Sequence, residues 1–233
     1  MQNLIEGMAR FYKEIFPQQK ELYEKLAADG QAPKAIMISC ADSRVVPELI
    51  TQVGPGELFV SRNAGNIVPP FAQSNGGVSS VIEYAVVALG VRDVIVCGHS
   101  GCGAMKALLN PVTLEAMPSV RSWLRHADAA RAIVCEAYPD DMDEVAKLHA
   151  LGLENVRAQL THLRTHPSVA ARIATGKLGL HGWFFEIERG RILALDGRTG
   201  KFVPLEVGME YTPVALEPHR RTVADDEPSA IGL

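Results

Sequence analysis

The sequence lacks the features that would place it in a membrane or on a nucleic acid. Its most apolar stretch, residues 78–91, includes Glu83 and Tyr84 and is shorter than the roughly 20 residues that a transmembrane helix needs. It has no run of Lys and Arg, and its net charge is −4. Since nucleic acids bind to basic surfaces, we expect neither a nucleic-acid nor a membrane partner.

Secretion signals and cysteine-rich patterns are also missing. The first residues, MQNLIEGMARFYKEIF, carry charges throughout, whereas a signal peptide has a basic start and an unbroken apolar stretch. We therefore expect a cytoplasmic, reducing location. The four cysteines are Cys40, Cys97, Cys102 and Cys135. In that compartment, metal ligation or burial explains them better than disulfides do.

The length of 233 residues fits one α/β domain spanning the whole chain, 1–233. Apolar residues at helical spacing predict a helical arm over residues 1–30, broken at Pro17. Such an arm could cap its own domain or hold a partner subunit. Residues 31–211 form the predicted core, and residues 212–233 are polar and contain proline, which predicts a loose tail.

The core alternates predicted strands and helices. Apolar runs without polar alternation predict strands buried on both faces at residues 34–40, 57–61 and 93–99. Helical spacing predicts helices at 78–89, 104–109, 119–137 and 141–165. The runs 180–188 and 191–196 predict a hairpin. The expected fold is an α/β protein with a mostly parallel central sheet flanked by helices, an N-terminal helical arm and a late antiparallel hairpin.

Two of the predicted strands end in residues that bind transition metals. Cys40 ends one strand, His99 ends another, and Cys102 follows three residues later at the start of a helix. The carboxyl ends of parallel strands form the sites of open α/β sheets. Two thiolates and an imidazole favour one zinc ion per chain and leave a fourth position for water. Plain burial is the better explanation for His99 and Cys102 alone, and the addition of Cys40 reverses that preference.

Asp42 and Arg44 follow Cys40 in the sequence CADSR. A carboxylate beside zinc can accept a hydrogen bond from bound water, or it can bind the metal as a fourth ligand and close the site. Arg44 can keep Asp42 ionised and away from the metal through a bidentate pair. In isolation, the same pattern is typical of a turn with a surface ion pair.

Four segments resemble the signature segments of the β-class carbonic anhydrases: CADSRVVPE, RNAGN, GGVSSVIEYAV and VIVCGHSGCGAM. The resemblance spans residues 31–109. It implies reversible hydration of carbon dioxide to bicarbonate and a proton, by zinc-bound hydroxide and an Asp–Arg dyad. The implied metal ligands are Cys40, His99 and Cys102. The implied dyad is Asp42 with Arg44.

The resemblance also implies a homodimer or larger oligomer with its sites at subunit interfaces. Gln31, Phe59 and Tyr84 match positions that line the substrate pocket in the plant-like branch of that family. Another branch uses a Trp three residues before the first cysteine to bind inhibitory bicarbonate. This chain has Met37 there, so we expect the open form of the site.

Two other functions remain open at the level of the sequence. The same zinc site could hydrolyse an analogue of carbon dioxide, such as carbonyl sulfide or carbon disulfide. A module that senses bicarbonate without catalysis is a second alternative, which the presence of Asp42, Arg44 and Gln31 disfavours. Cys97 and Cys135 are expected to be buried in the core. The other histidines lack ligand spacing: His126, His149, His162, His166, His181 and His219.

Overall fold

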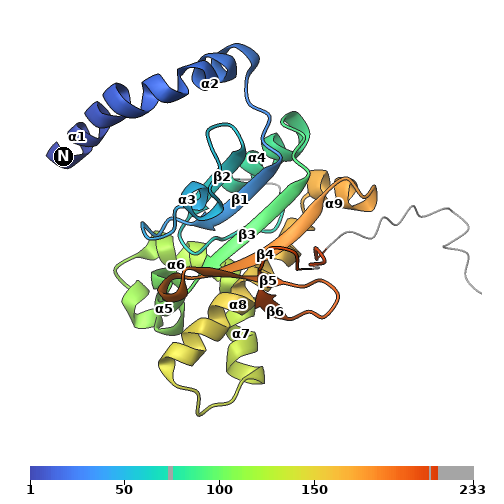
Figure 1. Cartoon of the computed structure of the whole chain (residues 1–233). Helices are drawn as coiled ribbons and strands as arrows, with labels where there is room; N and C mark the ends of the chain where they lie inside the picture. Colours follow the sequence, from blue (N-terminus) through green and yellow to red (C-terminus); the bar gives the residue numbers. More distant parts are fainter. Residues whose placement is uncertain (73–75, 210, 215–233) are drawn as a thin grey trace, which may run out of the picture.

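A six-stranded mixed sheet forms the centre of the molecule in the computed structural model, which describes residues 1–72, 76–209 and 211–214 (Figure 1). The strand order is β2-β1-β3-β4-β5-β6. The first four strands of this order are mutually parallel. Strand β5 runs antiparallel to both of its neighbours, β4 and β6. The strands are β1 (Ala35–Cys40), β2 (Leu58–Asn63), β3 (Asp93–His99), β4 (Gly179–Glu186), β5 (Arg191–Leu195) and β6 (Phe202–Pro204). The predicted mostly parallel sheet with a late antiparallel hairpin is confirmed.

Helices connect the strands and cover the sheet. The α-helices are α1 (Gln2–Arg10), α2 (Phe16–Asp29), α3 (Pro47–Thr51), α4 (Gly77–Glu83), α5 (Gly103–Leu109), α6 (Pro118–Leu124), α7 (Asp128–Ala137), α8 (Glu144–Leu163) and α9 (Pro167–Ala174). Shorter turns complete them: π-helical at Phe11–Ile15 and Tyr84–Ala88, and 3-10 at Pro111–Leu114, Arg125–Ala127 and Ile187–Arg189. No helix in the described part of the chain is both long and apolar enough to span a membrane.

Both faces of the central strands are buried, which explains their unbroken apolar sequences. Ile36 and Val94 face a core that also contains residues of α4, α8 and α9. Met37 and Ile95 face the opposite way and pack with Val45. A strand buried on both faces has no need of polar residues at alternate positions. The carboxyl ends of β1 and β3 therefore lie side by side in a rigid setting.

The N-terminal arm is one continuous helical rod, so the predicted break at Pro17 is wrong. The chain passes from α1 through the π-helical turn into α2, and Pro17 lies in the first turn of α2. The N–H of Phe16 donates to the carbonyl of Phe11, five residues back. A proline is tolerated in the first turn of a helix, and the wider π turn lets the rod continue.

Other boundaries differ from those predicted. The expected helix 119–137 is α6 and α7 with a 3-10 turn between them. Leu124, Ala127 and Ala130 are all buried, and their spacing of three matches the 3-10 period. Cys135 is exposed rather than buried, because it follows the inward-facing Val134 around α7.

The C-terminal segment of the described chain is attached to the sheet. The N–H of Gly197 donates to the carbonyl of Thr212 at 2.7 Å, and the N–H of Val214 donates to that of Leu180 at 2.8 Å. These contacts lie within the first residues of the predicted tail. The rest of that tail, and His219 with it, lies outside the described residues.

Candidate metal centre

Three potential metal ligands meet at the carboxyl ends of β1 and β3. Cys40 is the last residue of β1, His99 is the last residue of β3, and Cys102 immediately precedes α5. Their side-chain donor atoms all lie within 4.8 Å of one another, and all three residues are buried. The two sulfur atoms are 3.9 Å apart. No other group of three potential ligands of this kind occurs among the described residues.

The chemistry of this cluster fits zinc. The Cys102 thiol hydrogen-bonds to Cys40, which lowers the pKa of Cys40 and raises the pKa of Cys102. Without a cation, the two sulfur atoms share one proton in a thiol–thiolate hydrogen bond. A divalent ion would instead stabilise both residues as thiolates. His99 Nδ1 lies 2.9 Å from the carbonyl oxygen of Ser100. Its buried Nε2 has no hydrogen-bond partner among the described residues, as expected of a ligand atom.

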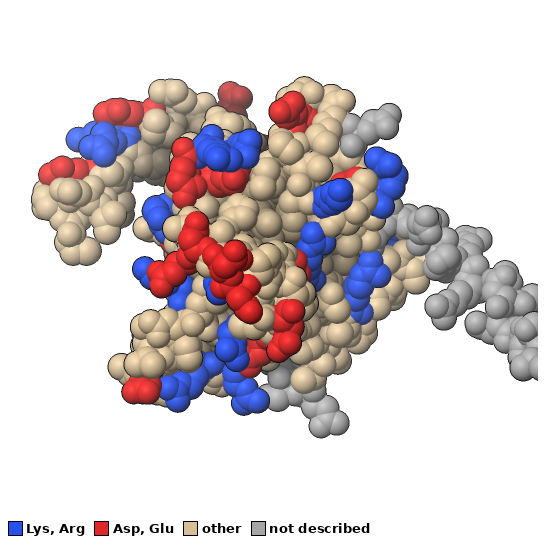
Figure 2. Space-filling model, turned by 90° about the horizontal axis from the view of Figure 1, so that it is seen from below, with Lys and Arg blue, Asp and Glu red and all other residues tan. Residues whose placement is uncertain are grey.

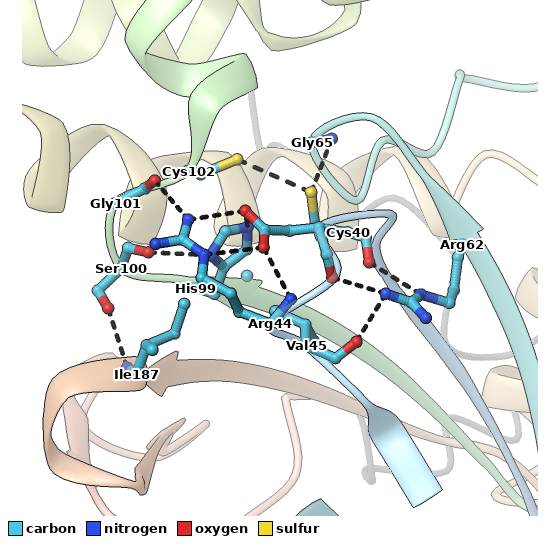
Figure 3. A network of polar contacts seen from close by, with 12 residues as sticks. Cys40, Arg44, Val45, Arg62, Gly65, His99, Ser100, Gly101, Cys102 and Ile187 are labelled. Atoms are coloured by element: carbon cyan, nitrogen blue, oxygen red, sulfur yellow. Dashed lines mark hydrogen bonds and ion pairs between the residues drawn. The ribbon is translucent and has the colours of Figure 1, made fainter. Parts of the chain in front are cut away.

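Asp42 and Arg44 form a bidentate pair beside this cluster, and Figure 3 shows Arg44 next to His99. Arg44 Nε donates to Asp42 Oδ1 at 2.9 Å, and Arg44 Nη2 donates to Oδ2 at 2.7 Å. These hydrogen bonds hold the pKa of the Asp42 carboxyl well below its usual range. Asp42 Oδ2 is 3.8 Å from His99 Nε2. An ionised carboxylate thus lies next to a ligand atom while an arginine holds both of its oxygens.

Arg62 fixes the loop that carries Cys40 and Asp42, a role that the sequence did not reveal. Its guanidinium donates to the main-chain carbonyls of Cys40 at 3.1 Å, Asp42 at 2.7 Å and Val45 at 2.6 Å. Figure 3 shows Arg62 reaching across from β2 to this loop. A charged residue near the end of the half-buried strand β2 was the available signal. Its targets are carbonyl groups, which leave no trace in the sequence.

Gly65 contributes a backbone group to the same centre. Its N–H donates to Cys40 Sγ at 3.4 Å, which stabilises negative charge on the sulfur. Gly65 has a φ of 82°, and a Cβ there would lie 3.0 Å from Met105 Cε. Glycine is favoured at this position because a side chain would be strained at this φ and would press against Met105.

Cys97 is buried close to the ligands but is not one of them. It packs with Met37 and Phe185 on one face of the sheet, and burial raises the pKa of its thiol to about 12. The predicted burial of this cysteine is confirmed.

The structure brings two of the three predicted substrate-pocket residues together. The rings of Phe59 and Tyr84 are 6.0 Å apart between centroids. Phe59 pairs with Ile36 in the sheet register, four residues before Cys40 and therefore roughly 13 Å away along the strand. Gln31 is exposed after the arm. The fold of one chain thus separates Phe59 from its own metal cluster.

Comparison with known proteins identifies the family. A model of the family described as carbonic anhydrase matches residues 35–192. The chain is 51% identical to a carbonic anhydrase of Pseudomonas aeruginosa, over 94% of this chain and 98% of that protein. It is also 51% identical to carbonic anhydrase 1 of Escherichia coli O157:H7, over 93% and 97% of the two chains.

Solved structures agree with this assignment. The β-carbonic anhydrase CcaA superposes with a TM-score of 0.86 at 44% identity, over 91% of this chain and 95% of that one. A tetrameric β-carbonic anhydrase of Sordaria macrospora superposes with a TM-score of 0.76 at 31% identity, over 87% and 98%. The clustered cysteines and histidine thus lie in a matching sequence and a matching fold, and the chain belongs to the β-carbonic anhydrase family of enzymes.

Proposed function

We propose that this chain catalyses the reversible hydration of carbon dioxide to bicarbonate and a proton, with one zinc ion held by Cys40, His99 and Cys102. The observation that carries the proposal is the buried ligand cluster with the arginine-held Asp42 beside it. Zinc bound there would supply a Lewis acid that acidifies a bound water molecule and so makes it a better nucleophile.

Asp42 and Arg44 supply the oriented charge that this reaction needs. Asp42 Oδ1 accepts hydrogen bonds from both the main-chain N–H and Nε of Arg44. Asp42 Oδ2 accepts from Arg44 Nη2 and retains a second lone pair that can accept a hydrogen bond from a reacting water molecule. The low pKa keeps the carboxylate ionised. The bidentate grip also opposes movement of Asp42 onto the metal, which supports the open form of the site and a catalytic role for the dyad.

The substrate pocket is proposed to be completed by a second copy of the chain. Phe59 and Tyr84 contact each other, but the strand register separates Phe59 from the ligands of its own chain. Gln31 and Tyr84 are exposed and therefore accessible to a neighbouring subunit. A homodimer or larger oligomer would place these three residues at the site of the partner, where they would line the pocket for carbon dioxide and bicarbonate.

Surface charge and cysteine chemistry bear on two further expectations, the lack of a nucleic-acid partner and a cytoplasmic location. Figure 2 shows one face of the molecule, on which acidic and basic side chains are interspersed rather than gathered into a basic surface. This face therefore offers no basic surface for a nucleic acid, in agreement with the net charge of −4. A zinc site with two thiolate ligands requires reduced cysteines, which supports the cytoplasmic location.

Stopped-flow acidification with carbon-dioxide-saturated water, combined with metal analysis, tests the proposed function. The wild type should bind one zinc per chain and accelerate acidification, whereas Cys102→Ala should lose most of its zinc and its activity. Cys135→Ala is the matched control, because Cys135 is exposed on α7, and it should behave as the wild type does. Full zinc occupancy with normal activity in Cys102→Ala would overturn the assignment.

A further inference from the structure

Ser100 holds the loop that carries His99 and Cys102 against the end of the neighbouring strand β4 and the turn that follows it. Its N–H donates to the carbonyl of Phe185 at 2.9 Å. Its hydroxyl donates to Glu188 Oε2 at 2.8 Å and accepts from the N–H of Ile187 at 2.9 Å. Figure 3 shows Ser100 facing Ile187 on the turn that follows β4. Ser100 therefore makes one hydrogen bond to β4 and two to the turn that follows it, and it is itself 7% exposed.

The position of Ser100 determines how His99 presents its ring. The carbonyl of Ser100 lies 2.9 Å from His99 Nδ1. A carbonyl only accepts hydrogen bonds, so Nδ1 must carry the proton and Nε2 keeps its lone pair free. Nε2 is the buried atom that has no hydrogen-bond partner among the described residues. Any shift of the Ser100 peptide group would rotate the imidazole and misdirect this lone pair.

Glu188 connects the same turn to the dyad. Its own N–H and the Ser100 hydroxyl lower the pKa of its carboxyl, so it is ionised. Its negative charge acts on the Arg44 guanidinium. Arg44 also donates to the carbonyl of Gly101 at 3.2 Å, in the same loop. The turn at Ile187–Arg189 thus lies next to both the ligand loop and the arginine that holds Asp42.

We propose that Ser100 and Glu188 are positioning residues for the metal centre. Their hydrogen bond, between residues 88 positions apart, anchors the ligand loop to the turn after β4 and fixes the tautomer and orientation of His99. This inference rests on the proposed zinc site. Partners of this kind typically change metal affinity by about 10-fold to 100-fold when they are removed.

Zinc release to a chromogenic chelator measures this anchoring without reference to activity. Ser100→Ala and Glu188→Ala should each release zinc about 10-fold faster or more. Glu188→Gln keeps an oxygen that can accept from Ser100, so it should release zinc at close to the wild-type rate. The double variant Ser100→Ala/Glu188→Ala should release zinc no faster than Ser100→Ala, because removal of the Ser100 hydroxyl already breaks its hydrogen bond to Glu188 as well as the one from Ile187.

Two additional measurements separate positioning from a general loss of structure. The absorption bands of the cobalt-substituted protein should change in Ser100→Ala and Glu188→Ala and not in Glu188→Gln, because they report ligand geometry. Glu136→Gln, at an exposed position on α7, is the control for the loss of a surface charge. Midpoints of denaturant unfolding of the zinc-free proteins should be similar for all variants.

The outcomes distinguish this inference from the proposed function. A wild type that binds no zinc would overturn the metal centre and the inference together. A wild type that binds zinc, with Ser100→Ala and Glu188→Ala releasing it at the wild-type rate, would overturn the inference and leave the metal centre in place. If Glu188→Ala and Glu188→Gln accelerated zinc release equally, the hydrogen-bond anchor would be overturned. Both substitutions remove the negative charge, but only Glu188→Ala removes the oxygen that accepts from Ser100.

Discussion

At the scale of single residues, the proposed role of Asp42 requires its carboxylate to lie beside the metal centre without binding the metal. Asp42 Oδ2 is only 3.8 Å from the ligand atom of His99, and a free carboxylate at that distance is a good zinc ligand. Arg44 donates hydrogen bonds to both carboxylate oxygens, which in the proposed function opposes this coordination. The same contact keeps Asp42 ionised, so one arginine provides both conditions for its proposed role.

Asp42→Asn should remove this role while zinc is retained. The amide has nearly the same shape as the carboxylate, but it lacks the charge and can present an N–H group to the reacting water. Loss of one oriented group of this kind costs about 10²- to 10⁴-fold in rate. Stopped-flow assays with metal analysis of the same samples measure both quantities. A variant within about twofold of the wild type would show that the dyad does not act in catalysis.

Arg44→Lys should lower the rate by a factor that does not change with pH. The bidentate pair lowers the pKa of Asp42, and its loss lets that pKa rise toward the ordinary value of about 3.9. Both values lie below neutral pH, so Asp42 stays ionised and only its orientation suffers, at a cost of roughly 10- to 100-fold. A pH–rate profile compares the two proteins. A deficit that disappears at alkaline pH would mean that Arg44 acts through ionisation instead.

At the scale of elements, the sequence predicts the strands better than the loops that position the ligands. The buried strands β1 and β3 are visible as apolar runs, and their last residues identify Cys40 and His99. β6 spans three residues and α9 eight, which is too short for a clear periodic pattern. The bonds of Arg62 and Ser100 depend on backbone groups that only the folded chain brings near.

The close contact between α8 and the sheet is another constraint that only the folded chain reveals. A Cβ at Gly152, on α8, would lie 2.6 Å from Cε2 of Phe184 on β4, and a Cβ at Gly98 would lie 2.9 Å from Cγ2 of Val156. Gly98 immediately precedes His99 in β3. Helix α8 can therefore support the end of the strand that carries a ligand only because these positions have no side chain.

Gly152→Ala should destabilise the protein despite alanine's better helix propensity. The propensity gain is about 1 kcal/mol, whereas overpacking against a buried ring costs about 1–3 kcal/mol. The matched control is Gly77→Ala in α4, where an added Cβ meets nothing within 4 Å. Urea unfolding gives both free energies. A Gly152→Ala protein as stable as Gly77→Ala would show that Phe184 moves aside without cost.

At the scale of the whole molecule, the N-terminal arm leaves much of its apolar surface exposed. No residue of α1 or α2 is buried, and Figure 1 shows the arm extending away from the sheet. Exposed apolar side chains follow it: Leu4, Ile5, Met8, Phe11, Tyr12, Ile15 and Leu22. Continuous apolar surface of this kind marks a protein interface. This arm and the exposed Tyr84 are features that a second subunit would cover.

The double variant Ile5→Asp/Met8→Asp should therefore produce smaller particles with lower activity. Ile5 is 53% exposed and Met8 is 71% exposed, so neither change disturbs the core, but two carboxylates would be costly to bury at an interface. Lys13→Asp, at another exposed position of the arm, is the control for added negative charge. Sedimentation at the assay concentration should give more than one 25.2 kDa chain per particle for the wild type and the control. The double variant should shift toward particles of one chain and lose activity in proportion, because the proposed pocket needs two chains. It should keep its zinc, because the three proposed ligands belong to one chain. A fully active monomer would show that the site is complete within a single chain.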